Sequence, residues 1–285
     1  MTGREKMDDE RVAILGGRGM LGSDLACGCQ PNFNTAVFDL PDLDITDPKQ
    51  LEQVVEQASI VVNCAAYTNV DGAEAQPELA YRVNAEAVGR LGRIAKQADV
   101  WVLHVSTDFV FDGKGEAPYV ETDRPNPVNT YGRSKLAGEK LLLETGCRCC
   151  IIRLEWTYGL HGNNFVAKLI KRAGDHKVLK VVDDQIGSPT ATTEAAKTIC
   201  KLLPAKPEGI FHFASEGYVS RFEMAQFVFD KLSMDVELRP CKSRDHRSPA
   251  ARPLNSRFDC TKIKALLDGP IAPWQAPLEA FLRRL

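Results

Sequence analysis

The chain has 285 residues, of which 44% are hydrophobic and 26% charged, and 36 basic against 38 acidic side chains give a net charge of -2. This composition excludes a disordered or fibrous protein. The balanced charge excludes a strongly basic surface for nucleic acid or anionic lipid, and no apolar run approaches the ~18 residues that a membrane span needs. We therefore expect a globular protein of one large or two modest domains.

The nine cysteines are better explained as small buried side chains than as ligands or disulfides. Cys27 and Cys29 lie close together, as do Cys147, Cys149 and Cys150, but the last of these lead directly into an apolar run. The N-terminal residues are charged and do not form an apolar signal segment. We therefore expect a cytoplasmic protein with reduced thiols, no metal site and no disulfide framework.

Short apolar runs alternate with longer segments of helical period through the first half of the chain. They predict strands at 11–15, 36–39, 60–64, 101–106 and 149–154, and helices from about residue 20, from Pro48 and over about 77–98. Continuous apolar runs are typical of parallel strands that are covered on both faces. The pattern predicts an α/β fold, a doubly wound parallel sheet of the Rossmann-like kind.

The organisation changes near Trp156, where shorter elements and loops begin. Residues 210–213 would return a strand to the first sheet. We predict a solvated tail over 1–10, a dinucleotide-binding domain over 11–155, and a smaller, interleaved C-terminal lobe over 156–285 that mainly binds substrate.

A glycine-rich turn, residues 16–22 (GGRGMLG), follows the first predicted strand and opens a helix. Glycines at 16, 19 and 22 permit a tight turn and close packing, and the helix N-terminus can face a pyrophosphate. The same pattern occurs in ordinary strand-to-helix turns. Asp39, at the end of the second predicted strand, favours the dinucleotide interpretation.

Two side chains favour different nicotinamide cofactors. Asp39 would accept hydrogen bonds from the adenosine ribose, which favours NADH. Arg18 either pairs with a 2′-phosphate, which favours NADPH, or points to solvent. Asp44 either contacts adenine or caps the helix that begins at Pro48. We favour NADPH, with NADH as the alternative.

Tyr131 and Lys135 are four residues apart, so on a helix they share one face. A lysine ammonium ~4 Å from a phenolate offers roughly 4 kcal/mol at an effective dielectric of ~20. The pair is therefore expected to lower the pKa of Tyr131 toward neutral pH, where a general acid works best. Thr107 and Asp108 directly follow the fourth predicted strand, where ligands bind in such sheets. The Thr107 hydroxyl would hold a substrate carbonyl beside Tyr131, which predicts a hydride-transfer site in which Lys135 also contacts the nicotinamide ribose.

Seven segments, taken in order, resemble a known family: 62–71 (VNCAAYTNVD), 106–113 (STDFVFDG), 131–139 (YGRSKLAGE), 156–159 (WTYG), 162–165 (GNNF), 184–190 (DQIGSPT) and 252–256 (RPLNS). The chain is similar over nearly its whole length to the dTDP-4-dehydrorhamnose reductases, a group of extended short-chain dehydrogenases/reductases. This resemblance implies reduction of the C4 ketone of dTDP-4-dehydro-L-rhamnose by NADPH or NADH, which gives dTDP-L-rhamnose.

The resemblance also implies which residues form the site. Thr107, Tyr131 and Lys135 match the catalytic residues of the family, and Asp108 matches a carboxylate near the sugar. Together with the glycine turn, the expected cofactor-binding residues are Gly16, Arg18, Gly19, Met20, Leu21, Gly22, Asp39, Asp44, Ala65, Ala66, Tyr67 and Lys135. The residues expected around the nucleotide sugar are Thr107, Asp108, Trp156, Asn164, Gln185, Thr190 and Arg252.

Three positions depart from the family pattern. Phe109 stands where the family usually has tyrosine, so one hydroxyl contact to the sugar is missing. Glu155 stands near a usual Ser or Thr, and a buried carboxylate there would need a partner. Arg18 stands where the family often has threonine, and an arginine at this position is similar to the phosphate turn of GDP-fucose synthase.

Other readings share the fold and the Tyr131–Lys135 pair. GDP-fucose synthase carries a cysteine where this chain has Asp108, and a UDP-glucose 4-epimerase would retain bound NAD. The regulatory β subunit of methionine adenosyltransferase also resembles these reductases and acts by binding a partner subunit. The intact set of Thr107, Tyr131 and Lys135 favours an enzyme. We expect a nucleotide-sugar ligand and no nucleic-acid or membrane partner, and leave a homodimer open.

Overall fold

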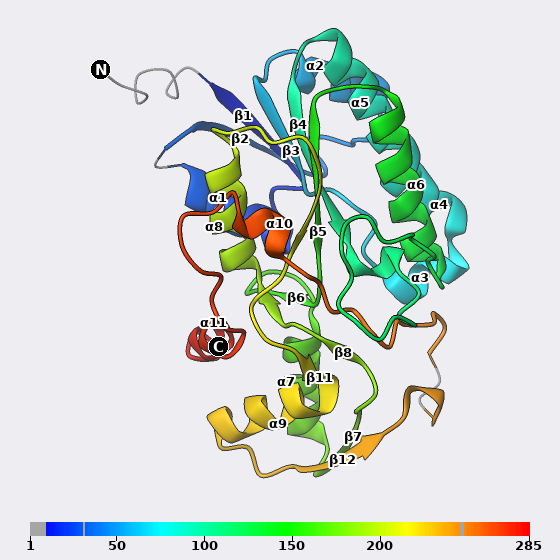
Figure 1. Cartoon of the computed structure of the whole chain (residues 1–285), viewed down its shortest axis with the longest axis vertical. Helices are drawn as coiled ribbons and strands as arrows, with labels where there is room; N and C mark the ends of the chain where they lie inside the picture. The colour runs from blue at the N-terminus through cyan, green and yellow to red at the C-terminus, as the bar shows by residue number, and fades with distance from the viewer. Residues whose placement is uncertain (1–9, 31, 246–247) are drawn as a thin grey trace.

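Six parallel strands form the centre of the computed structural model, which describes residues 10–30, 32–245 and 248–285 (Figure 1). The strands lie in the order β10-β5-β4-β3-β1-β2. Their bounds are β1 (Arg11–Leu15), β2 (Asn34–Phe38), β3 (Ile60–Asn63), β4 (Trp101–Thr107), β5 (Cys149–Leu154) and β10 (Gly209–Phe213). The order places β1 beside both β2 and β3, as in a sheet wound in two directions. The predicted α/β class and doubly wound parallel sheet are confirmed.

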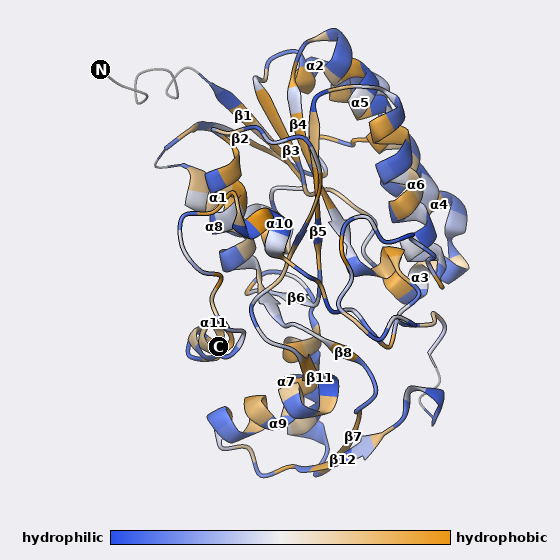
Figure 2. Cartoon of the chain, in the orientation of Figure 1, coloured by the Kyte–Doolittle hydropathy of each residue, from blue (hydrophilic) through white to orange (hydrophobic). Residues whose placement is uncertain are grey.

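Helices cover both faces of this sheet. One face packs against α1 (Met20–Cys29), α8 (Thr192–Leu202) and α10 (Thr261–Lys264), and the other against α2 (Pro48–Val55), α5 (Ala87–Gln97) and α6 (Thr130–Glu144). The strands appear in Figure 2 as a hydrophobic layer between the helices, because their side chains are buried from both sides. Within the described part of the chain, no helix has the length and apolarity required to cross a membrane.

A smaller lobe lies at the carboxyl end of the sheet. It contains α7 (Phe165–Asp175), α9 (Arg221–Leu232), α11 (Gln275–Leu282) and three strand pairs: β6 (Thr157–Tyr158) with β9 (Thr190–Ala191), β7 (Val178–Val182) with β12 (Glu237–Cys241), and β8 (Ile186–Gly187) with β11 (Val219–Ser220). Its own core includes Leu169, Val228 and Leu278. The chain after Trp156 thus builds this lobe and also returns α8 and β10 to the main sheet (Figure 1).

Two predicted elements differ in detail. The second strand begins at Asn34, which pairs with Arg11, and ends before Asp39. The single helix expected over 77–98 consists of α4 (Pro77–Tyr81), a π-helical segment Arg82–Glu86, and α5, after a short α3 (Val70–Ala75). The π-helical segment holds the buried Asn84, whose amide bonds both backbone groups of Tyr67. A polar anchor of this kind leaves no trace in apolar periodicity.

The predicted N-terminal tail is described only at its last residue, because residues 1–9 lie outside the described part. The Glu10 carboxylate forms an ion pair with Lys206 at 2.6 Å, and both side chains are partly buried. Glu10 is therefore anchored to the segment that follows α8, which differs from the free tail expected there.

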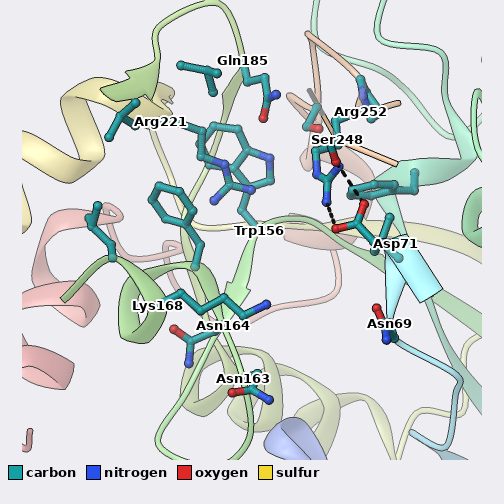
Figure 3. A pocket seen from close by; sticks show the side chains of 18 of the residues that line it. Asn69, Asp71, Trp156, Asn163, Asn164, Lys168, Gln185, Arg221, Ser248 and Arg252 are labelled. Atoms are coloured by element: carbon teal, nitrogen blue, oxygen red, sulfur yellow. Dashed lines mark hydrogen bonds and ion pairs between the residues drawn. The ribbon is translucent and has the colours of Figure 1, made fainter. Parts of the chain in front are cut away.

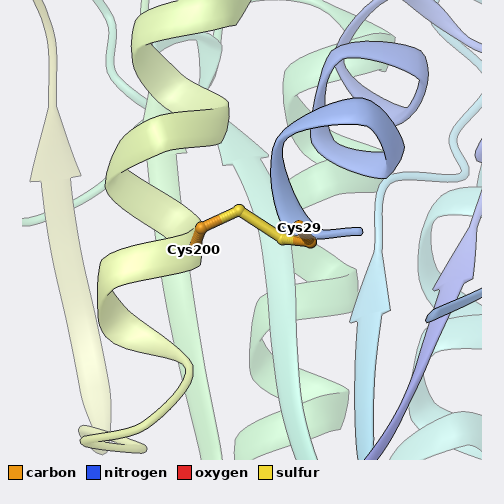
Figure 4. Close-up of a disulfide and its surroundings, with 2 residues drawn as sticks. All are labelled: Cys29 and Cys200. Carbon is orange, nitrogen blue, oxygen red and sulfur yellow. A yellow bond between two sulfur atoms is a disulfide. The ribbon is translucent and has the colours of Figure 1, made fainter. Parts of the chain in front are cut away.

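A disulfide joins Cys29 at the end of α1 to Cys200 in α8 (Figure 4). The expectation that no cysteines pair is wrong for these two. They are 171 residues apart in sequence, yet α1 and α8 pack on the same face of the sheet and bring their Cα atoms to 5.9 Å. The other seven cysteines are free, and Cys147, Cys149, Cys150 and Cys260 are buried as expected. Over the described ranges, no group of three His, Cys, Asp or Glu side chains is placed to hold a metal ion.

Candidate active site

Two cavities open at the carboxyl ends of the strands. One, of about 550 Å³, lies along the glycine turn and the ends of β2, β3 and β4, and the other, of about 830 Å³, lies between the sheet and the smaller lobe. The two share the lining residues Thr68, Val70, Phe109, Trp156, Asn163 and Arg221. Ligands bound in the two cavities would therefore touch each other at this shared wall.

The smaller cavity fits a dinucleotide. Gly16 has φ +71°, and a Cβ there would lie 2.6 Å from the Ala65 backbone, so only glycine lets this turn pass β3. No side chain caps the N-terminus of α1, so its first-turn amides and helix dipole can serve an anionic group. Of the predicted cofactor residues, this cavity is lined by Gly16, Gly19, Met20, Leu21, Gly22, Asp39, Asp44, Ala65, Ala66 and Lys135.

Arg18 and Tyr67 are the two predicted cofactor residues that do not line the cavity. The Arg18 guanidinium donates to the Leu40 carbonyl oxygen at 3.0 Å and pairs with Asp42, and its side chain is 58% exposed. The backbone N–H of Arg18 donates to Asp39 at 2.8 Å. Arg18 therefore lies beside the predicted adenosine end, held by a carboxylate of the protein.

Asp44 does not cap α2. Asp47 is the N-cap and accepts hydrogen bonds from the N–H groups of Lys49 and Gln50, while Asp44 accepts from the backbone and hydroxyl of Thr46. Because Asp44 also lines the smaller cavity, its remaining alternative, contact with adenine, stays a prediction.

The catalytic candidates converge at the floor of the same cavity. Tyr131 and Lys135 lie on α6, whose first turn is capped by Asn129 through a 2.7 Å bond from the Gly132 N–H. Thr107 ends β4 beside them, and all three line the cavity. Lys135 Nζ donates to the Val105 carbonyl oxygen at 2.7 Å, and burial lowers its pKa to about 8.

The expected lowering of the Tyr131 pKa is wrong. Loss of hydration in this buried setting raises it to about 12, and the interaction with the Thr107 hydroxyl offsets only part of this. Phe109 contributes to the apolar surroundings, because its ring packs edge-on against Tyr131 with centroids 5.5 Å apart. The phenol therefore stays protonated at neutral pH.

Two carboxyl groups are buried behind the catalytic residues. Asp108 accepts hydrogen bonds from the hydroxyls of Ser256 at 2.5 Å and Thr107 at 3.1 Å, and burial raises its pKa to about 6. Glu155 is fully buried, and no hydrogen bond to its carboxylate oxygens is found within the described residues. Burial, and then the charge of Asp108, raise the pKa of Glu155 well above its usual range. Glu155 therefore lacks, among the described residues, the partner expected from the sequence for a buried carboxylate, and burial favours its neutral form.

A buried ion pair supports the same helix. Glu139 lies four residues after Lys135 on α6 and bonds Arg153 of β5, with both side chains 2% exposed and 2.6 Å between charged atoms. Glu139 also accepts a 2.5 Å hydrogen bond from Ser106 of β4. The helix is therefore tied to the two strands that carry the candidate site.

Of the predicted nucleotide-sugar residues, Trp156, Asn164, Gln185 and Arg252 line the larger cavity (Figure 3). Arg252 pairs with Asp71 at 2.9 Å and also bonds Ser248. Asn164 caps α7 by accepting from the Ala167 N–H at 3.0 Å. Thr190 is different, because it is fully buried and bonds the Ser188 carbonyl oxygen at 3.1 Å. The structure does not bring Thr190 to either cavity wall.

Sequence reasoning missed Arg221, which lines both cavities. It is the first residue of α9, and the capping box of Ser220 and Glu223 marks that helix start. The S-x-x-E spacing was visible in the sequence, but nothing in it places the helix against the candidate site. Asp71, Asn163, Lys168, Arg172 and Lys180 also line the larger cavity.

Comparisons with known proteins identify the family. The model described as the RmlD substrate binding domain matches residues 10–285. A dTDP-4-dehydrorhamnose reductase of Mycobacterium tuberculosis is 38% identical, over 99% of this chain and 94% of the relative. The crystal structure of dTDP-4-dehydrorhamnose reductase from Bacillus anthracis in complex with NADP is 35% identical with a TM-score of 0.93, over 98% of this chain and 100% of that chain. The corresponding structure from Clostridium acetobutylicum is 33% identical with a TM-score of 0.92, over 96% of this chain and 99% of that chain. The resemblance seen in the motifs is confirmed, and the chain belongs to the dTDP-4-dehydrorhamnose reductase family.

Proposed function

We propose that the protein reduces the C4 ketone of dTDP-4-dehydro-L-rhamnose to dTDP-L-rhamnose with NADPH. The observation that carries this proposal is that Thr107, Tyr131 and Lys135 line the cavity along the glycine turn, which also shares a wall with the second cavity. The similarity to reductases named for this substrate supports its identity, and the NADP-bound relative supports the cofactor. NADH is the alternative cofactor.

When bound, the cofactor supplies the hydride. Tyr131 acts as the general acid and gives its phenol proton to the ketone oxygen, which its raised pKa allows because the proton is present at neutral pH. The Thr107 hydroxyl, which donates to Asp108 in this structure, turns its proton to the same oxygen when the ketone is bound. Lys135, held on Val105, carries positive charge beneath the site and contacts the nicotinamide ribose. Asp108 binds a sugar hydroxyl.

The two cavities divide the ligands between them. The segment 11–155 supplies the strand ends and the glycine turn, and we assign the dinucleotide to it. The segment 156–285 supplies most of the larger cavity, including Gln185 and Arg252, and we assign the nucleotide sugar to it. Arg252 suits a diphosphate because a guanidinium offers paired donors.

The test is to follow NADPH oxidation against a panel of dTDP-, UDP- and GDP-linked 4-keto sugars. We expect turnover with the dTDP sugar and at least tenfold lower kcat/KM with the other two. Equal turnover of all three would contradict the nucleotide assignment. No turnover with any of them would favour the regulatory alternative, which a partner-subunit binding assay would then examine.

A further inference from the structure

Six of the described residues line the wall that both cavities share, and Arg221 is the charged one among them. Its guanidinium carbon lies 3.5 Å from the centroid of the Trp156 ring and 4.6 Å from that of Phe165. Figure 3 shows Arg221 and Trp156 together on one side of the larger cavity and the Arg252–Asp71 ion pair on the other. A ligand group at the shared wall therefore lies close to the Arg221 side chain.

The surroundings fix this guanidinium before any ligand arrives. Trp156 has φ +46°, and its indole packs so closely on Gly187 that a Cβ at Gly187 would lie 2.6 Å from it. The capping box of Ser220 and Glu223 sets the first turn of α9, on which Arg221 lies. Stacking on the indole uses the flat face of the guanidinium, so the N–H groups at its edge remain available to donate to a ligand.

The charge of Arg221 is less compensated than that of its neighbour Arg252. Arg252 is paired with Asp71 at 2.9 Å, whereas among the described residues the Arg221 guanidinium makes neither an ion pair nor a hydrogen bond. The charged groups that face Arg221 are Asp108, Glu155 and Arg252. Among the described residues neither carboxyl forms an ion pair or a hydrogen bond with the Arg221 guanidinium, and burial raises the pKa of both carboxyls.

We propose that Arg221 is a substrate-binding residue that recognises the phosphate attached directly to the sugar. This inference rests on the proposed function. With the ketone at Tyr131 and the nucleoside in the larger cavity, the sugar-linked phosphate lies at the wall between them. A stacked guanidinium presents paired donors that match phosphate oxygens in that place. Lys168, Arg172 and Lys180 line only the larger cavity and are therefore assigned to other parts of the ligand.

The test compares dTDP with dTMP, because only dTDP carries a phosphate in the sugar-linked position. Binding of each is measured by calorimetry to the full-length protein with NADP⁺ present, for wild type, Arg221→Met and the control Arg172→Met. We expect Arg221→Met to weaken dTDP binding by about tenfold to a hundredfold, the usual effect of losing hydrogen bonds to a charged group. Its dTMP binding should change less than about twofold, and Arg172→Met should leave the ratio of the two affinities unchanged.

Because Arg221 also lines the dinucleotide cavity, folding of each variant is checked by far-UV circular dichroism and thermal unfolding rather than by NADP⁺ affinity. If Arg221→Met is not folded, Arg221→Lys is measured instead, and the ratio of dTDP to dTMP affinity should still fall. An unchanged ratio in a folded Arg221 variant would overturn the inference and leave the proposed function intact, provided that wild type turns over the dTDP sugar. Failure of wild type both to bind dTDP and to reduce the dTDP sugar would overturn the proposed function and this inference together.

Discussion

Lys135 donates a hydrogen bond from Nζ to the backbone carbonyl oxygen of Val105 at 2.7 Å, and this bond joins α6 to β4 at the base of the candidate site. The ammonium also lies 3.4 Å from Nε2 of the buried His104. Burial and the charge on Lys135 lower the pKa of His104 well below its usual range, so the ring stays neutral. Lys135 thus supplies positive charge at the base of the candidate site and also fixes the position of α6 against β4.

Lys135→Met should therefore lower both kcat and NADPH affinity. We expect a loss of about tenfold or more in kcat/KM, because a hydrogen-bonded charge is removed from the site. Since the pKa of Lys135 is about 8, wild-type activity should also fall as pH rises through that value and the charge is lost. Steady-state kinetics from pH 6 to 10 would check both. Lys140→Met, on the exposed face of α6, is the control and should match wild type.

Tyr131→Phe should lower turnover by about 10²–10⁴-fold, the usual contribution of a general acid. NADPH binding should persist, because the ring still packs against Phe109. Single-turnover reduction and a separate fluorescence titration with NADPH would separate the two effects. Tyr119→Phe removes a hydroxyl outside both cavities and serves as the comparison. Near-wild-type turnover in Tyr131→Phe would remove the phenol from the proton-transfer step.

The Asp42 carboxylate pairs with the Arg18 guanidinium. We expect this pairing to lower the preference for NADPH over NADH, because it competes with a 2′-phosphate for Arg18. Replacing the carboxylate in Asp42→Asn would leave Arg18 free to meet a 2′-phosphate. We expect the ratio of kcat/KM for NADPH to that for NADH to rise by about threefold to tenfold, since exposed charge pairs contribute modestly. Arg18→Ala should shift the same ratio toward NADH. If neither variant moves the ratio, Arg18 takes no part in cofactor choice.

Glu155→Gln should change how stability depends on pH. The folded state of the wild type raises the pKa of Glu155, so the unfolded state loses that proton first as pH rises above about 4.3, the usual pKa of glutamate. Wild-type stability should then fall by up to about 1.4 kcal/mol per pH unit until the folded-state pKa is reached. Glutamine does not titrate, so the free energy of unfolding of the variant, relative to that of the wild type, should increase as pH rises above about 4.3. Urea unfolding at three pH values would measure this.

The matched control for Glu155→Gln is Glu52→Gln, because Glu52 lies exposed on α2. Its stability should follow the wild-type pH dependence. A constant difference in unfolding free energy between Glu155→Gln and wild type across the pH range would show that Glu155 is not held neutral in the folded protein.

The disulfide between Cys29 and Cys200 predicts seven reactive thiols in protein unfolded without reductant and nine after reduction. Cys200→Ala should lower the free energy of unfolding of the oxidised protein by about 2–5 kcal/mol. Cys27→Ala, at an exposed position, should change it little. Nine thiols before reduction would mean that the two sulfurs are not bonded in the isolated protein.

Local patterns in the sequence were enough to predict the sheet. Continuous apolar runs located five of its strands, the short run at 210–213 predicted the sixth, β10, and the order of motifs identified the family. Tyr131 and Lys135 could be paired because helix geometry alone brings them together. By contrast, Arg221 and the Cys29–Cys200 bond depend on packing between segments far apart in the chain. The pKa of Tyr131 was misjudged because spacing along the helix gives neither the cost of burial nor the fact that the Lys135 ammonium donates to the Val105 carbonyl oxygen.

The ion pair between Glu139 and Arg153 has a consequence for how such an enzyme can diverge. Tyr131, Lys135 and Glu139 occupy one stripe of α6, so any rotation that redirected the phenol would pull a buried carboxylate from its guanidinium. The buried ion pair thus fixes the orientation of the Tyr131 side chain. The groups proposed to bind the nucleotide sugar lie instead mainly on separate loops and helices of the smaller lobe, where they can be exchanged one at a time. New substrates can be acquired there while the proposed proton donor keeps its orientation.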